Sequence, residues 1–94
     1  MTINEYFEEC KKLTYKEFKS YSEDTLEWID EALISADKQT RKDLNNTSRF
    51  IKCALFFVCN NGRIPMGCTD EYELAHLKII LDSINKNQGI TPRE

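Results

Sequence analysis

The segment FIKCALFFVC, residues 50–59, is apolar at every position except Lys52 and is followed by Asn60-Asn61-Gly62. A helix that is hydrophobic on all sides has to be covered on all sides. The segment therefore predicts a fold organised about one central helix, with the other helices packed against it. At 94 residues the chain is long enough for one such domain.

Capping signals and apolar spacing predict the other elements. Thr2 with Glu5, and Thr14 with Glu17, fit the capping box that opens a helix. We expect a first amphipathic helix from Thr2, a short aromatic helix over 14–21, and longer helices over about 23–37, from Thr40 to Gly62, and from Thr69 to Gly89. No segment alternates as a strand does, so the predicted class is all-α: a compact bundle of four main helices plus one short helix. Residues 1–94 are expected to form one helical domain, with a short tail over 90–94.

Charge is distributed unevenly along a chain whose net charge is −3. Residues 1–37 hold ten acidic and four basic side chains, whereas residues 38–63 hold six basic and one acidic. Such segregation indicates either a charged binding face or attraction between successive antiparallel helices, and internal complementarity is the favoured interpretation. The first residues lack the basic and apolar pattern of a secretory signal, and no segment reaches the ~20 apolar residues of a membrane span, so a cytoplasmic location without membrane contact is expected.

The cysteines and the single histidine do not predict a metal centre or a catalytic site. No two cysteines are spaced as Cys-x-x-Cys, and Cys10, Cys53 and Cys59 are expected to be small buried hydrophobes, with Cys68 left open. His76 alone cannot form a two-histidine site within one chain. No cofactor and no catalytic residue is expected, and the chain is not predicted to be an enzyme. A small-ligand site near Cys59, Cys68 and His76 is the least favoured alternative.

An acidic arc with one tryptophan gives the main candidate site. At ~100° per residue, Glu23, Asp24, Glu27 and Glu31 fall on one arc of a helix, with Trp28 at its edge. An exposed Trp beside charged residues is typical of anchors in protein interfaces. The alternative is that the first helix or the aromatic segment 15–21 covers Trp28.

A basic stripe gives a second candidate. Lys42, Asn45, Arg49 and Lys52 lie on one side of the expected central helix, as in helices that contact phosphates or base edges. The favoured interpretation of this stripe is nevertheless structural, because the chain is acidic overall and lacks a helix-turn-helix signature.

A third surface is predicted on the last helix, opposite its stripe of Leu and Ile residues. Tyr72, His76 and Ile79 share this side, which could pack internally, form a homodimer interface or receive a partner. Internal packing is slightly favoured.

These observations favour a small non-catalytic module that binds a protein partner by occlusion, with a basic protein as the candidate partner. In size and acidity the chain is similar to bacterial immunity proteins, antitoxins and phage-encoded inhibitors, a similarity of bulk properties that transfers no residue. A nucleic-acid-binding module using the basic stripe is the alternative.

Overall fold

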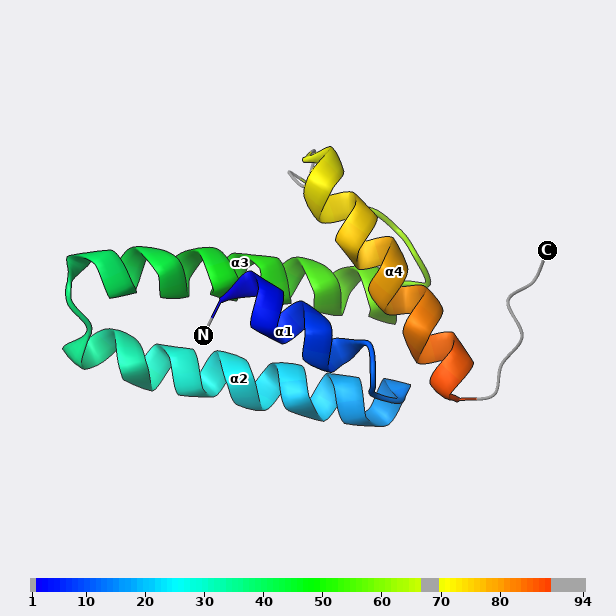
Figure 1. Cartoon of the computed structure of the whole chain (residues 1–94), viewed down its shortest axis with the longest axis horizontal. Coiled ribbons are helices and arrows are strands. Elements are labelled where there is room, and N and C mark those ends of the chain that lie inside the picture. The colour runs from blue at the N-terminus through cyan, green and yellow to red at the C-terminus, as the bar shows by residue number, and fades with distance from the viewer. Residues whose placement is uncertain (1, 67–69, 89–94) are drawn as a thin grey trace.

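Four helices make up most of the computed structural model, which describes residues 2–66 and 70–88 (Figure 1). They are α1 (Ile3–Cys10), α2 (Tyr15–Ser35), α3 (Lys38–Cys59) and α4 (Glu71–Asn87), and the described residues contain no strand. The predicted all-α class is confirmed. The expected tail over 90–94, Cys68 and the Gly89 end lie outside the described residues. The cap of the last helix is described, and it is Asp70 rather than the predicted Thr69.

The short aromatic helix and the helix expected from 23 are one continuous helix, α2. The break was predicted because Ser22 precedes Glu23 and Asp24, as a capping serine would. Ser22 is instead fully buried, and its hydroxyl is hydrogen-bonded to that of Tyr6 in α1. A serine that finds a side-chain partner inside the bundle no longer competes with the helix backbone, so α2 continues through it.

The start of α3 differs from the prediction. Asp37, rather than Thr40, is the N-cap, and its carboxylate accepts a hydrogen bond from the Thr40 amide at 2.8 Å. Hydrogen bonds from the backbone and side chain of Thr40, and from the backbone of Gln39, also hold the pKa of Asp37 below its ordinary value. The link between α2 and α3 is therefore very short, and the two helices form an antiparallel hairpin.

The end of α3 combines two left-handed residues, Asn61 with φ 55° and Gly62 with φ 92°. The Gly62 amide donates to the Phe57 carbonyl at 2.8 Å and the Asn61 amide to the Val58 carbonyl at 3.3 Å, which is the Schellman pattern. Gly62 also lies close to α4, since a Cβ there would be 3.5 Å from Leu81 Cδ2. The predicted helix stop near Gly62 is confirmed.

The other caps explain how α1, α2 and α4 begin. Thr2 and Thr14 both form the predicted capping boxes, with Glu5 and Glu17 respectively. In α4 the carboxylate of Asp70 accepts from the Tyr72 and Glu73 amides, so Asp70 is the N-cap.

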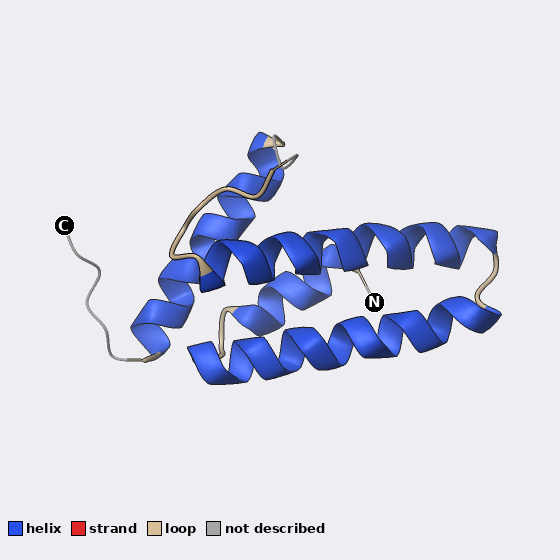
Figure 2. Ribbon diagram, turned by 180° about the vertical axis from the view of Figure 1, so that it is seen from behind, coloured by secondary structure: helices blue, strands red, loops and turns tan. Residues whose placement is uncertain are grey.

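The helices are arranged around the α2–α3 hairpin. In Figures 1 and 2, α2 and α3 run side by side along the longest dimension of the molecule, α1 lies against the hairpin, and α4 crosses the far end of α3 at a steep angle. Helix α3 contacts all three other helices. The dimensions are 46 × 26 × 18 Å, and the hairpin extends beyond α1 and α4 at its closed end. Within residues 2–66 and 70–88, no helix has both the length and the apolar character of a bilayer span.

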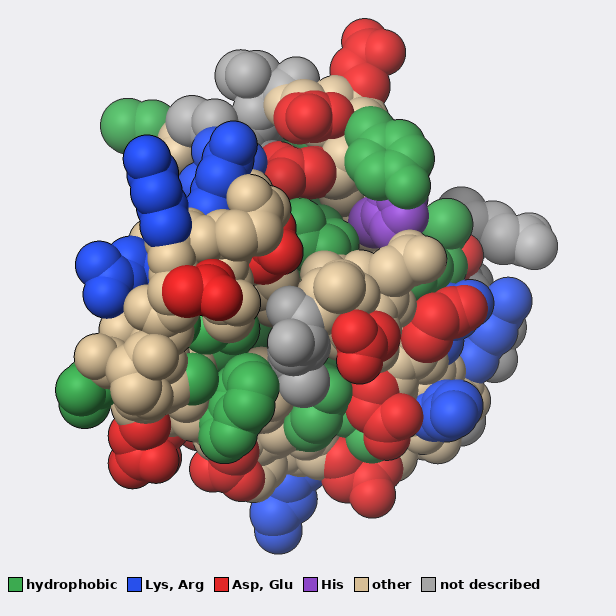
Figure 3. Space-filling view, turned by 60° about the vertical axis from the view of Figure 1, so that its left-hand side comes forward, with side chains coloured by type: hydrophobic (Ala, Val, Ile, Leu, Met, Phe, Trp, Pro, Cys, Tyr) green, Lys and Arg blue, Asp and Glu red, His purple; other side chains and the backbone are tan. Residues whose placement is uncertain are grey.

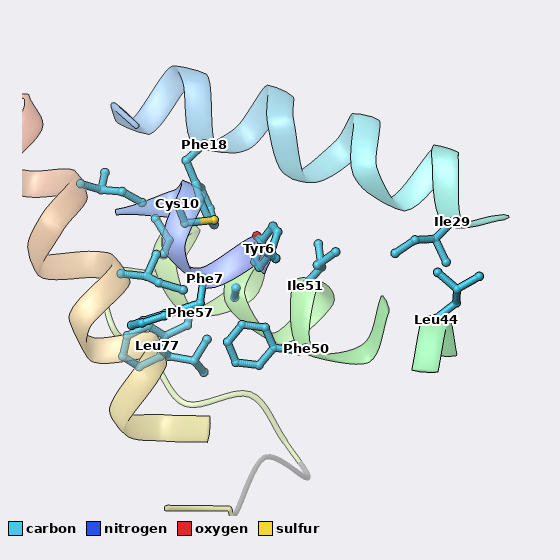
Figure 4. Close-up of a cluster of buried hydrophobic side chains, with 14 residues drawn as sticks. Tyr6, Phe7, Cys10, Phe18, Ile29, Leu44, Phe50, Ile51, Phe57 and Leu77 are labelled. Atoms are coloured by element: carbon cyan, nitrogen blue, oxygen red, sulfur yellow. The ribbon is translucent and has the colours of Figure 1, made fainter. Parts of the chain in front are cut away.

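The core is formed where α1, α3 and α4 meet, and it continues between α2 and α3. Figure 4 shows most of the cluster around Tyr6, Phe7, Phe50 and Phe57, while Ile29 and Leu44 face each other apart from it, nearer the closed end of the hairpin. Tyr6 stacks on Tyr21 of α2 and meets Phe50 of α3 edge to face. These aromatic contacts join three helices in one core.

The apolar segment of α3 is helical, as predicted, but it is not enclosed on all sides. Phe50, Ile51, Ala54, Phe57 and Val58 are buried, which confirms its place in the core. In contrast, Phe56 is 42% exposed and Cys59 is exposed, in line with Lys52 on the same side of the helix. The neighbouring helices pack on the remaining sides of α3, so the expectation of a fully covered helix is wrong on this side.

Candidate functional site

The outer side of α2 carries the predicted acidic arc. Glu23, Asp24, Glu27, Glu31 and Trp28 are all exposed, and half of the Trp28 surface (50%) is accessible. Neither α1 nor the aromatic turn of α2 covers the indole completely. The arrangement therefore matches the exposed interpretation of Trp28 rather than the buried one.

Two adjoining surface hollows lie beside this arc. One, of about 190 Å³, is lined by Tyr21, Asp24, Thr25 and Trp28. The other, of about 450 Å³, is lined by side chains from the first turns of α2 and shares Tyr21 and Asp24 with it. Trp28 thus forms a wall of a depression and does not stand alone on a convex surface.

The acidic side chains of α2 are not neutralised by α3. Among the described residues the ion pairs are Glu8–Lys11, Glu9–Lys12 and Arg49–Glu73, and none joins α2 to α3. Attraction between these two helices was the favoured explanation of the uneven charge. The predicted attraction does not take the form of ion pairs between α2 and α3, because each helix packs its apolar side against the other and exposes its charged side to solvent.

The basic stripe is present on α3. Lys42, Asn45, Arg49 and Lys52 are exposed, and Lys38 and Arg41 extend the same side toward the start of the helix. Figure 3 shows a group of Lys and Arg side chains at the upper left, away from the carboxylates at the lower edge of this face. Arg49 is engaged with Glu73 of α4 at 3.5 Å, so it is the member of the stripe that has an ionic partner within the described part of the chain.

The predicted patch on α4 is partly packed and partly open. The His76 ring lies 4.4 Å from the Phe7 ring of α1 and 4.3 Å from the Tyr72 ring, measured between centroids. Its Nδ1 is 2.7 Å from the Tyr72 carbonyl oxygen, which can only accept, so Nδ1 carries the proton. Tyr72 is 69% exposed and Ile79 is also exposed. Internal packing, the slightly favoured prediction, therefore holds for His76 but not for Tyr72 or Ile79.

A hollow of about 370 Å³ lies next to this patch (Figure 3). It is bordered by the start of α1, the middle of α3 and, from α4, Tyr72 and His76. Asp43 of α3 is its charged member among the described residues.

The described cysteines have three different environments. Cys10 is fully buried, Cys53 is half-buried and Cys59 is exposed. The prediction of a buried hydrophobe is confirmed for Cys10 and wrong for Cys59, which accepts a hydrogen bond from the Tyr15 hydroxyl at 3.4 Å. Within the described ranges no group of three His, Cys, Asp or Glu side chains could hold a metal ion.

Sequence reasoning missed two members of the α2 surface, Tyr21 and Thr25, which line the Trp28 hollow. Tyr21 had been placed in a separate short helix, although its spacing of seven from Trp28 puts both on one side of a continuous helix. The spacing was visible, but the false break at Ser22 concealed its meaning.

Comparison with known proteins identifies no relative: no family model, no curated protein and no solved structure matches the chain. The assignment of function therefore depends on the geometry of the molecule itself.

Proposed function

We propose that this chain is a small non-catalytic module that binds a protein partner through the outer side of α2 and acts by occluding the surface it covers. The observation that carries this proposal is the half-exposed Trp28 on the wall of a hollow, next to carboxylates without an ionic partner in the described residues. Aromatic side chains of this kind supply much of the energy of protein interfaces.

The partner would present a basic surface. Glu23, Glu27 and Glu31 lie on the solvent side of α2 and would steer such a surface during the encounter. Trp28 would then enter an apolar depression of the partner, and the charges would fix the orientation. Rim charges of this kind act mainly on the association rate and on its dependence on salt.

The test compares capture of a partner by the tagged chain and by two variants. Trp28→Ala should weaken capture by about thirtyfold or more, the loss expected for an interface anchor worth about 2 kcal/mol. Ile64→Ala is the control, because Ile64 is a 53% exposed apolar residue that follows α3 and does not belong to α2. Unchanged capture by Trp28→Ala, with unchanged salt dependence, contradicts the proposal.

The basic side of α3 supports a second candidate function, binding of nucleic acid. Lys42, Asn45 and Lys52 are exposed on one side of α3, and the acidic side of α2 lies along the opposite long edge of the molecule. The interaction between exposed charges weakens beyond the Debye length, which is about 8 Å at physiological salt. The net charge of the whole chain therefore does not by itself argue against this function, which depends on the local charge of α3.

A mobility assay with duplex and single-stranded nucleic acid at low salt tests this candidate. Binding through α3 should weaken steeply with salt and should be reduced by Lys42→Gln combined with Lys52→Gln. Lys16→Gln combined with Lys19→Gln changes the net charge equally on α2 and is the control. Absence of a complex at low salt removes the candidate.

A homodimer interface stays one of the predicted uses of the Tyr72, His76 and Ile79 patch on α4, where Tyr72 and Ile79 are exposed. Light scattering across protein concentration tests it. A mass that stays that of one chain contradicts it.

A further inference from the structure

The hollow beside Trp28 has a simple chemical composition. Its lining consists of two aromatic rings, from Tyr21 and Trp28, one carboxylate, from Asp24, and the side chain of Thr25. Asp24 and Trp28 are four residues apart on α2 and hence are neighbours on one side of the helix. No Lys or Arg lines this hollow among the described residues.

Two of these four side chains already have partners inside the protein. The Thr25 hydroxyl donates to the Tyr21 carbonyl at 2.7 Å. The Tyr21 ring stacks on the Tyr6 ring with a centroid distance of 5.7 Å and an interplanar angle of 10°. The wall that Tyr21 provides is therefore held by the core, and the other two lining residues, Asp24 and Trp28, are the exposed ones.

A carboxylate beside an accessible indole favours a flat cation. The guanidinium group of arginine stacks on aromatic faces and can donate two parallel hydrogen bonds to one carboxylate. An ammonium group offers neither the flat surface nor the paired donors. Lys16 borders the adjoining hollow together with Glu17, and it does not belong to the lining of the Trp28 hollow.

We propose that the Trp28 hollow binds an arginine side chain of the protein partner, with the guanidinium between the Asp24 carboxylate and the Trp28 ring. This inference depends on the proposed function, because it names the chemical group through which the partner engages α2. It goes further in assigning Asp24 and Tyr21 to the binding surface and in predicting that arginine is preferred to lysine.

Trp28 is the chain's single tryptophan, so its fluorescence reports on this hollow directly. We would titrate the whole chain with acetyl-arginine-amide at constant ionic strength and compare it with acetyl-lysine-amide and with the uncharged isostere acetyl-citrulline-amide. The arginine compound should bind about tenfold more tightly than the citrulline compound, as a stacked cation with one carboxylate partner allows. The lysine compound should fall between the two.

Two variants make this test specific. Asp24→Asn keeps the size of the side chain and should reduce the preference for arginine over citrulline to about twofold or less. Asp30→Asn is the control, since Asp30 is an exposed acid of α2 that does not line the hollow, and it should retain the full preference. Equal binding of arginine and citrulline by the unmodified chain, or a preference that Asp24→Asn leaves intact, overturns the inference.

The outcome can be separated from that of the proposed function. If the partner is captured through Trp28 but arginine is not preferred, the arginine assignment fails and the protein-binding function stands. If Trp28→Ala leaves capture unchanged, the protein-binding function through α2 fails whatever the arginine titration gives.

Discussion

The hydroxyl groups of Tyr6 and Ser22 form a hydrogen bond between two side chains that are both fully buried, one in α1 and one in α2. A buried polar group that loses its partner costs about 1 to 3 kcal/mol. The bond therefore fixes the position of α1 on the hairpin as well as contributing to stability.

Replacing Ser22 by Ala should lower the free energy of unfolding by about 1 to 3 kcal/mol, because the Tyr6 hydroxyl then lacks this partner. Urea denaturation followed by circular dichroism measures the change. Ser20→Ala is the control at an exposed position of the same helix and should alter stability by less than about 0.5 kcal/mol. Equal effects of the two variants would show that the buried bond contributes nothing specific.

Stability should fall at alkaline pH because of Cys10. Burial raises the pKa of the Cys10 thiol from 9.0 to about 12. The unfolded chain releases this proton near the ordinary pKa while the folded chain retains it, so the free energy of unfolding falls as pH rises between these values. One such group contributes at most about 1.4 kcal/mol per pH unit.

The variant Cys10→Ala should show a weaker pH dependence, even though the smaller side chain lowers stability at neutral pH. Burial also raises the pKa of Tyr6, so the comparison is clearest between about pH 9 and 10, below the ordinary pKa of tyrosine. Chemical denaturation at several pH values in this range provides the slopes. Identical slopes for both proteins would contradict the assignment to Cys10.

Asn87 at the end of α4 holds the turn between α1 and α2. Its side-chain amide donates to the carbonyls of Lys11 at 3.0 Å and Leu13 at 2.8 Å. Asn87→Ala should cost about 1 kcal/mol and should accelerate hydrogen exchange in the first turn of α2. Lys86→Ala, at an exposed neighbour, is the control, and equal exchange in the two variants would argue against a role for Asn87.

The thiols of Cys59 and Cys10 should differ strongly in reactivity. Cys59 is exposed, whereas Cys10 has no accessible surface and can react only after an opening of the structure. Labelling with a maleimide, followed by peptide mapping, should show Cys10 modified more than about a hundredfold more slowly than Cys59. Comparable rates would mean that α1 is not held against the hairpin.

Much of the fold follows from local signals in the sequence. The structure contains both predicted capping boxes, at Thr2 and at Thr14. Helix α3 ends in left-handed residues near Gly62, as predicted. The sequence suggested a break at Ser22 because a serine before two acids has the local pattern of a cap. Its true role depends on Tyr6, sixteen residues away, and no local pattern contains that contact.

The exposure of residues on the candidate surfaces was predictable from the sequence in some cases and not in others. Exposure of Trp28 follows from projection of one amphipathic helix, and the structure agrees with it. The exposure of Phe56 could not be derived in this way, because it depends on which side of α3 the other helices leave open. Likewise, the stack of Phe7 on His76 requires knowing that α1 and α4 are neighbours.

Among residues 2–66 and 70–88, the closed end of the hairpin consists of α2 and α3 alone, which meet there through side chains such as Ile29 and Leu44 (Figure 4). Segments with few tertiary neighbours open at lower free energy than the rest of a protein. Trp28 directly precedes Ile29 in the sequence. Tryptophan fluorescence should therefore change when this end of the hairpin opens, before the aromatic cluster around Phe50 unfolds. A thermal transition followed by tryptophan emission would then precede the one followed by helical ellipticity, and the part of α2 around Trp28 would be the first part of the molecule to open.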